Sequence, residues 1–133
     1  MSLDNKTWNP IAKLHKSVSR HCAVQITEDT LYIIGGHIGA SSFSGETIIF
    51  NTLTRKLKTL EATLNKGRQL HSCARLNENH IIVVGGRDAR GALKSVETLD
   101  TRRPTHWNER KNLELPIGIS YAQLVANPSG AYP

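Results

Sequence analysis

Leu31-Tyr32-Ile33-Ile34-Gly35-Gly36 decides the fold, because 50 residues later the chain reads Ile81-Ile82-Val83-Val84-Gly85-Gly86. The same offset, without a gap, places His21 on His71. A second step of 50 residues places Tyr121 under His71. A match at one fixed offset indicates a repeat protein, in which each unit packs on its neighbour.

The repeated unit has the pattern of short β-strands. Leu31–Ile34 and Ile81–Val84 are unbroken apolar runs rich in β-branched residues, which predicts strands buried on both faces. The glycine pair after each run is expected to end the strand and to permit close backbone approach. No stretch keeps a helical period. The expected strands are Ala23–Ile26, Leu31–Ile34, Glu46–Phe50 and Lys56–Leu60 in the first unit, and Ala74–Leu76, Ile81–Val84, Ser95–Leu99 and His106–Arg110 in the second.

Four short strands in a unit of about 50 residues are typical of a β-propeller blade. The residues resemble the Kelch-repeat family. The resemblance rests on the paired glycines Gly35, Gly36, Gly85 and Gly86, on Arg68-Gln69-Leu70-His71-Ser72, and on Tyr32, Asn51, Asp100, Trp8 and Trp107. Departures from the pattern are Leu57 in place of the outer-strand tryptophan, Ile82 in place of the tyrosine, and the family's arginine, which is shifted to Arg20 in the first unit and is Gly118 in the third.

The resemblance implies an all-β fold of Kelch-type four-stranded antiparallel blades that form an incomplete propeller. Residues 1–17 would hold the outer strand of a preceding blade and a connecting loop, 18–62 the first repeat, 63–113 the second, and 114–133 a truncated third. Closed propellers have about four to eight blades. We therefore expect a fragment of a larger propeller, or a chain that self-associates through open blade faces.

Composition excludes several classes of protein. The 133 residues suffice for one small domain, and the formal net charge is 17 − 11 = +6. The longest apolar run is strand-sized, so no membrane segment is expected. Aromatic residues are only 5% of the chain and basic residues are scattered, which argues against nucleic-acid binding. The first six residues lack the apolar core of a secretory signal, which predicts a cytoplasmic protein.

The resemblance also implies a binding site, because Kelch propellers bind ligands at one mouth, on the loops after the glycine pair and before the inner strand. Guanidinium groups there would hold carboxylates, which favours an acidic protein partner. The alternative is that these loops are solvated turns whose arginines pair with local acids. The partner-binding candidates are Arg20, His37, Ser41, Ser42, Arg68, Arg87 and Arg90.

Other recurring residues are expected to be structural, namely the four paired glycines with Trp8, Trp107, His21 and His71. The tryptophans should pack between blades. No acidic or thiol ligand recurs with the histidines, so we predict no metal and expect them to hydrogen-bond the backbone of a neighbouring blade. Cys22 and Cys73 lie 51 residues apart, one more than the repeat, which should point them to opposite faces. No disulfide is therefore expected.

The sequence favours a non-catalytic protein–protein interaction module without a cofactor, because it contains no positioned nucleophile, phosphate loop or paired carboxylates. Two alternatives remain. The chain could be part of a propeller enzyme, of the oxidase or sugar-processing type, with its active site mostly in missing blades. Such a site needs several Tyr, His or Glu residues from different blades, and of tyrosines this chain offers only Tyr32, Tyr121 and Tyr132, the first and last at equivalent packing positions. It could also have a purely structural role in a larger repeat protein.

Overall fold

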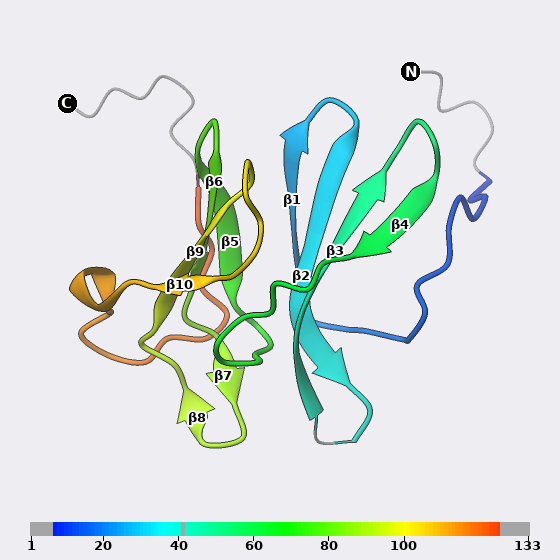
Figure 1. Ribbon diagram of the computed structural model, residues 1–133. Helices are drawn as coiled ribbons and strands as arrows, with labels where there is room; N and C mark the ends of the chain where they lie inside the picture. Colours follow the sequence, from blue (N-terminus) through cyan, green and yellow to red (C-terminus); the bar gives the residue numbers. More distant parts are fainter. Residues whose placement is uncertain (1–6, 41, 126–133) are drawn as a thin grey trace.

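The computed structural model describes residues 7–40 and 42–125 and consists of two antiparallel sheets that stand side by side (Figure 1). Each has four strands, so the predicted all-β class and four-stranded antiparallel blades are confirmed. Blade 1 has the order β1 (Cys22–Thr27), β2 (Thr30–Ile38), β3 (Ser42–Asn51), β4 (Lys56–Thr59). Blade 2 has the order β5 (Ser72–Asn77), β6 (His80–Val84), β9 (Val96–Asp100), β10 (Asn108–Glu109).

Two smaller elements complete the described part of blade 2. The strands β7 (Arg87–Asp88) and β8 (Gly91–Ala92) form a short hairpin between β6 and β9. A single 3-10 turn, η1 (Lys111–Leu113), follows β10. In the ranges described, no helix is long and apolar enough to cross a membrane.

The strand registers of the two blades are equivalent. Ile33 pairs with Ile48 in blade 1, and Val83 pairs with Glu97 in blade 2. The offset is thus 50 residues on the second strand and 49 on the third. This difference is the one-residue gap that the sequence match requires after the glycine pair.

The hydrophobic core lies between the two blades. Tyr32 and Ile34 are buried in β2, but Ile81 and Val83 are buried in β6, so the two strands bury opposite faces. Opposite faces are buried because the two equivalent sheets are stacked in the same orientation. One face of blade 1 therefore meets the opposite face of blade 2. The expectation that both faces of these strands are buried is therefore wrong, because the side chains between them, such as Ile33 and Ile82, remain half-buried.

The glycine pairs stand where the backbone turns and neighbouring chains touch. Gly35 and Gly85 have φ of 63° and 61°, a region that favours glycine. A Cβ on Gly85 would lie 2.5 Å from the carbonyl oxygen of Ile119. The pair ends β6 as expected, but β2 runs through Gly36 to Ile38, because a bulge between Ile34 and Gly36 lets the pairing with β3 resume.

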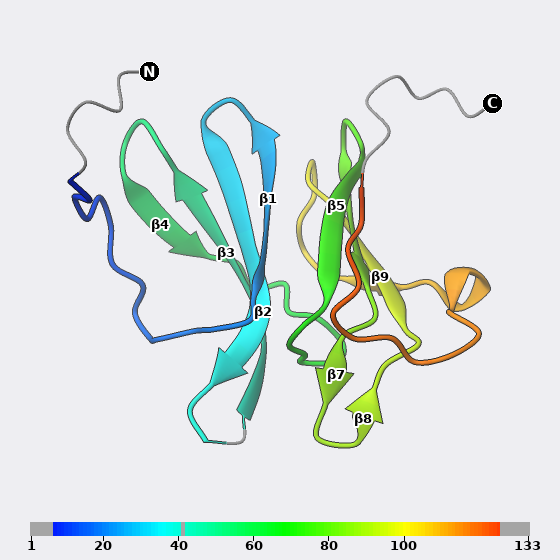
Figure 2. The ribbon, with the colours of Figure 1, turned by 180° about the vertical axis from the view of Figure 1, so that it is seen from behind.

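The chain after η1 returns beside β5 (Figure 2). Its hydrogen bonds show which of its residues correspond to those of the first two repeats. Arg20, Leu70 and Tyr121 all have positive φ, of 56°, 55° and 62°. The Leu70 amide donates to the Arg20 carbonyl, and the Tyr121 amide to the Leu70 carbonyl. Tyr121 is thus the equivalent of Leu70. The alignment of Tyr121 with His71 is wrong by one residue, because the second unit is one residue longer than the first.

The two tryptophans have different surroundings. Trp107 is 3% exposed, and its indole Nε1 donates to Thr47 Oγ1 of blade 1 at 2.9 Å. Trp8 is fully exposed, so the expectation that it packs between blades is wrong for the described structure. The difference has a physical reason: blade 1 covers Trp107, whereas no described residue covers Trp8.

Candidate functional site

The hairpins that follow the two glycine pairs project from the same end of the molecule. Figure 1 shows the β2–β3 hairpin and the β7–β8 hairpin side by side at the lower end, opposite the β1–β2 and β5–β6 turns. We call this end the hairpin rim and define it by residues 19–20, 37–40, 42–43, 69–70 and 87–92. It is the region in which the sequence placed the partner-binding candidates.

Each hairpin of the rim is held by the segment that enters the inner strand. Ser19 and His37 exchange two backbone hydrogen bonds, of 3.1 and 2.7 Å, and Gln69 and Arg87 exchange two of 3.0 and 2.9 Å. The side chain of Arg20 then links the two, because its Nη1 donates to Gln69 Oε1 at 3.0 Å. The rim is therefore one hydrogen-bonded unit that spans both blades.

Exposed positive charge collects on this rim. The side chains of Arg20, Arg87 and Arg90 are exposed, and none makes an ion pair with any residue that the structure describes. Asp88, the nearby acid, accepts the backbone amide of Arg90 at 2.8 Å. Unpaired guanidinium groups are suited to binding carboxylates in two-point contacts.

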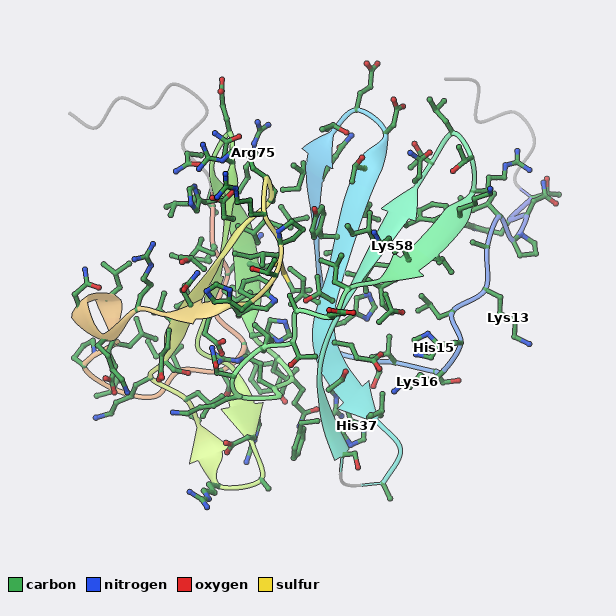
Figure 3. All side chains as sticks on the ribbon, viewed as in Figure 1. Lys13, His15, Lys16, His37, Lys58 and Arg75 are labelled. Carbon is green, nitrogen blue, oxygen red and sulfur yellow. A yellow bond between two sulfur atoms is a disulfide. The ribbon has the colours of Figure 1, made fainter. Side chains whose placement is uncertain are left out.

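An aromatic side chain and a histidine lie beside this charge. His37 and Phe43 pair across β2 and β3, and their rings lie with centroids 5.8 Å apart and planes tilted by 57°. Both are half-buried, and Figure 3 shows His37 near the tip of the rim. Ser42, a predicted binding residue, is exposed at the start of β3. Ser41, another, lies outside the described residues.

Arg68 does not belong to the exposed rim, and its predicted role in partner binding is wrong. Its side chain is fully buried and bonds the carboxylate of Glu97, which is also fully buried. The Nη1 atom donates to the carbonyls of Gly85 at 2.9 Å and Ser95 at 3.2 Å. Burial lowers the pKa of Arg68, and the charge of Glu97 opposes this shift. The alternative considered from the sequence, an arginine paired with an acid, describes this residue.

Glu97 organises the connection between the blades. One carboxylate oxygen accepts the backbone amide of Asn65 at 2.7 Å and its side-chain amide at 2.8 Å. The other binds Arg68. Asn65 also donates to the carbonyl of Trp107 at 2.9 Å. Sequence reasoning missed Glu97, although an acidic residue in the middle of a predicted buried strand, Ser95–Leu99, is a signal for a paired charge.

His71 behaves as the sequence predicted. It is 7% exposed, and its Nε2 lies 3.0 Å from the carbonyl oxygen of Ile34, in the neighbouring blade. Burial, together with the charge of Arg68, lowers the pKa of His71 to about 4. Its Nδ1 has no hydrogen-bond partner among the described residues. His21, the equivalent in blade 1, is exposed.

Cys22 and Cys73 form a disulfide between β1 and β5, so the expectation of unbonded cysteines is wrong. Their Cα atoms lie 6.0 Å apart, within the range that disulfides span. The extra residue in their spacing does point the side chains to opposite faces. The contact between the blades joins one face of blade 1 to the opposite face of blade 2. Side chains that point to opposite faces of the two sheets therefore meet in this contact.

The residues weighed for enzyme chemistry do not come together. Tyr32 is 4% exposed in the core between the blades, where burial raises its pKa. Tyr121 is 74% exposed at the start of the third repeat, and Tyr132 lies outside the described residues. Within residues 7–40 and 42–125, no three side chains of His, Cys, Asp or Glu are grouped closely enough to hold a metal ion.

A comparison with known proteins supports the repeat assignment. The mouse (Mus musculus) protein Kelch domain-containing protein 9 is 31% identical to this chain over 119 residues. The match covers 86% of this chain but 34% of that protein, so the chain spans about a third of the length of the curated relative it matches. No protein-family model matches the chain. The chain is thus similar to a Kelch-domain protein over most of its length.

Proposed function

We propose that this chain is a non-catalytic protein-interaction module that uses its hairpin rim to bind an acidic segment of a protein partner. One observation carries the proposal: Arg20, Arg87 and Arg90 are exposed on a single hydrogen-bonded rim and have no acidic partner among the described residues. The similarity to a Kelch domain-containing protein supports it, because loops on a rigid β scaffold commonly carry binding specificity.

The chemistry of the rim favours one kind of ligand. A carboxylate would gain charge-assisted hydrogen bonds from the arginines, and the neighbouring pair of His37 and Phe43 would contact an apolar side chain. A partner segment that alternates acidic and apolar residues fits both features. The net charge of +6 speeds the approach of such a segment, and added salt should weaken its binding.

The test compares charge reversal on the rim with charge reversal elsewhere. The double variant R87E/R90E should lose binding to a fluorescent oligo-glutamate peptide by at least about tenfold, measured by fluorescence anisotropy at low salt. The control K58E/R75E has the same net charge, and its sites lie on β4 and β5 away from His37 (Figure 3). It should retain most of the binding. Equal losses in the two double variants would mean that only net charge matters, which would contradict the assignment of the site.

A further inference from the structure

The Cys22–Cys73 disulfide lies directly behind the hairpin rim, between strands β1 and β5, which stand side by side in Figures 1 and 2. Cys22 is the first residue of β1 and follows the rim residue Arg20 by two positions. Cys73 is the second residue of β5 and follows the rim residue Leu70 by three. The rim segments of the two blades are therefore tied by a covalent bond, close to the hydrogen bond from the Leu70 amide to the Arg20 carbonyl at 3.0 Å.

The contact between blade 2 and the third repeat shows that such segments also dock without a disulfide. Gly86 donates its backbone amide to the Ile119 carbonyl at 2.8 Å, and Tyr121 donates its amide to the Leu70 carbonyl at 3.0 Å. The corresponding bonds between the two blades run from Gly36 to Arg68 and from Leu70 to Arg20. Both cysteines of the chain belong to the contact between the blades. The disulfide is thus an addition to a contact that hydrogen bonds make without it.

The disulfide also controls how the arginines of the rim are placed. The ring that it closes contains β1 to β4, the whole of blade 1, because the two cysteines are 51 residues apart. Arg20 is positioned by the alignment of the two blades, since its Nη1 donates to Gln69 Oε1 at 3.0 Å across their contact. A change in this alignment therefore moves Arg20 relative to Arg87 and Arg90.

The disulfide is within reach of a reductant, because both of its cysteines are half-buried rather than buried. A thiolate of a dithiol attacks one sulfur, the bond between the two cysteine sulfurs breaks, and a mixed disulfide forms. The second thiol of the dithiol then closes its own disulfide and releases the chain. Two electrons and two protons pass to the protein, which leaves Cys22 and Cys73 as thiols. Reduction removes the covalent link but none of the hydrogen-bonding groups of the contact.

We propose that this disulfide is a redox switch for the hairpin rim, an inference that rests on the proposed function. In the oxidised chain, Arg20 on blade 1 is held at a fixed separation from Arg87 and Arg90 on blade 2. An acidic ligand that contacts arginines of both blades then has little left to immobilise. In the reduced chain the two blades shift relative to each other at this edge, and the ligand has to order them. The oxidised chain is therefore the form that binds, and a dithiol reductant is the regulator.

The first test follows backbone amides and needs no ligand. Hydrogen exchange is measured by NMR for the oxidised chain and for the chain kept in dithiothreitol, with alkylation and mass spectrometry to count free thiols in each. Reduction should speed exchange at Gly36 and Leu70, whose amides bridge the contact that the disulfide closes. Gly86 and Tyr121 are the matched controls, because they make the same bonds in the contact without a disulfide.

The acceleration at Gly36 and Leu70 should exceed that at Gly86 and Tyr121 by at least about tenfold. An equal acceleration at all four amides would mean that reduction only destabilises the whole chain, and the switch would be overturned. Unchanged exchange at all four, or two free thiols in the chain before any reductant is added, would overturn it as well.

The second test measures binding of the fluorescent oligo-glutamate peptide by anisotropy at low salt in both redox states. The reduced chain should bind about fivefold more weakly, roughly the effect of having to immobilise one more flexible side chain. C22S/C73S should bind as weakly as the reduced wild type and should not respond to dithiothreitol. Equal affinity of the oxidised and reduced wild type would overturn the switch and leave the proposed function intact. Binding in neither state would refute the proposed function and the switch together.

Discussion

His71 links the contact between the blades to pH. Its imidazole is buried against the Ile34 carbonyl, and its pKa falls to about 4 from the ordinary value of 6.5, mainly through burial. The folded state therefore resists a proton that the unfolded state accepts readily. Stability is full above about pH 6.5 and declines as pH falls toward 4, with a total loss of about 3 kcal/mol from this group.

The magnitude at an accessible pH follows from the same two pKa values. Between about pH 7 and pH 5, the His71 contribution to the free energy of unfolding should decline by about 2 kcal/mol. H71Q is the test variant, because a glutamine amide can still donate to the Ile34 carbonyl but does not titrate. Its free energy of unfolding should fall about 2 kcal/mol less than that of the wild type over this range.

The assay is urea unfolding followed by tryptophan fluorescence at both pH values. H106Q serves as the control, because His106 is exposed and is not among the groups whose charge acts on His71, so its substitution should leave the acid sensitivity that comes from His71 intact. If H71Q and the wild type lose the same free energy between the two pH values, burial of His71 does not govern the acid response, and the reasoning is refuted.

Three further predictions concern the contacts around the blade interface, each measured by urea unfolding. R68V should cost about 3–5 kcal/mol because it leaves Glu97 buried without its counter-charge, and the double variant R68V/E97I should be more stable than R68V alone; strictly additive losses would contradict this. Removing the Cys22–Cys73 disulfide by double serine substitution should cost up to about 4 kcal/mol for a spacing of 51 residues, and the wild type, denatured without reductant, should show no free thiol. G85A should lower the free energy of unfolding by more than about 1–2 kcal/mol. That much is the strain of an alanine in the left-handed region, and the new Cβ would in addition meet the Ile119 carbonyl.

Local pattern was sufficient to predict the strands of both blades. Unbroken β-branched runs and turn residues located β1 to β6, β9 and β10 to within a few residues, because the strand period and glycine geometry act locally. The predicted hydrogen bond of His71 to a neighbouring blade is confirmed, since it rested on the repeat itself. Whether the rim arginines bind a partner stays a prediction.

The wrong predictions share one cause. Each depends on how neighbouring blades pack against each other, which the sequence pattern within one blade does not indicate. The Cys22–Cys73 disulfide was rejected because the sequence argument took equivalent faces to be the ones in contact. The prediction for Arg68 failed because nothing local indicates that Glu97, 29 residues away, lies beside it. Trp8 failed for a related reason, since a repeat position becomes buried only where a neighbouring element covers it.

The broken symmetry between the blades carries the most information about this molecule. A repeat with identical interfaces would keep Arg68 and Glu97 in every unit, yet the first unit has Val18 and Ile48 at those positions. A change at only one of the two positions would leave a buried charge without its partner, which lowers the free energy of unfolding by about 3–5 kcal/mol. Both positions differ together, so neither of them leaves a lone charge in the first unit. The Arg68–Glu97 pair therefore belongs to the contact between these two blades, where Glu97 also holds Asn65, and is not a feature of every unit.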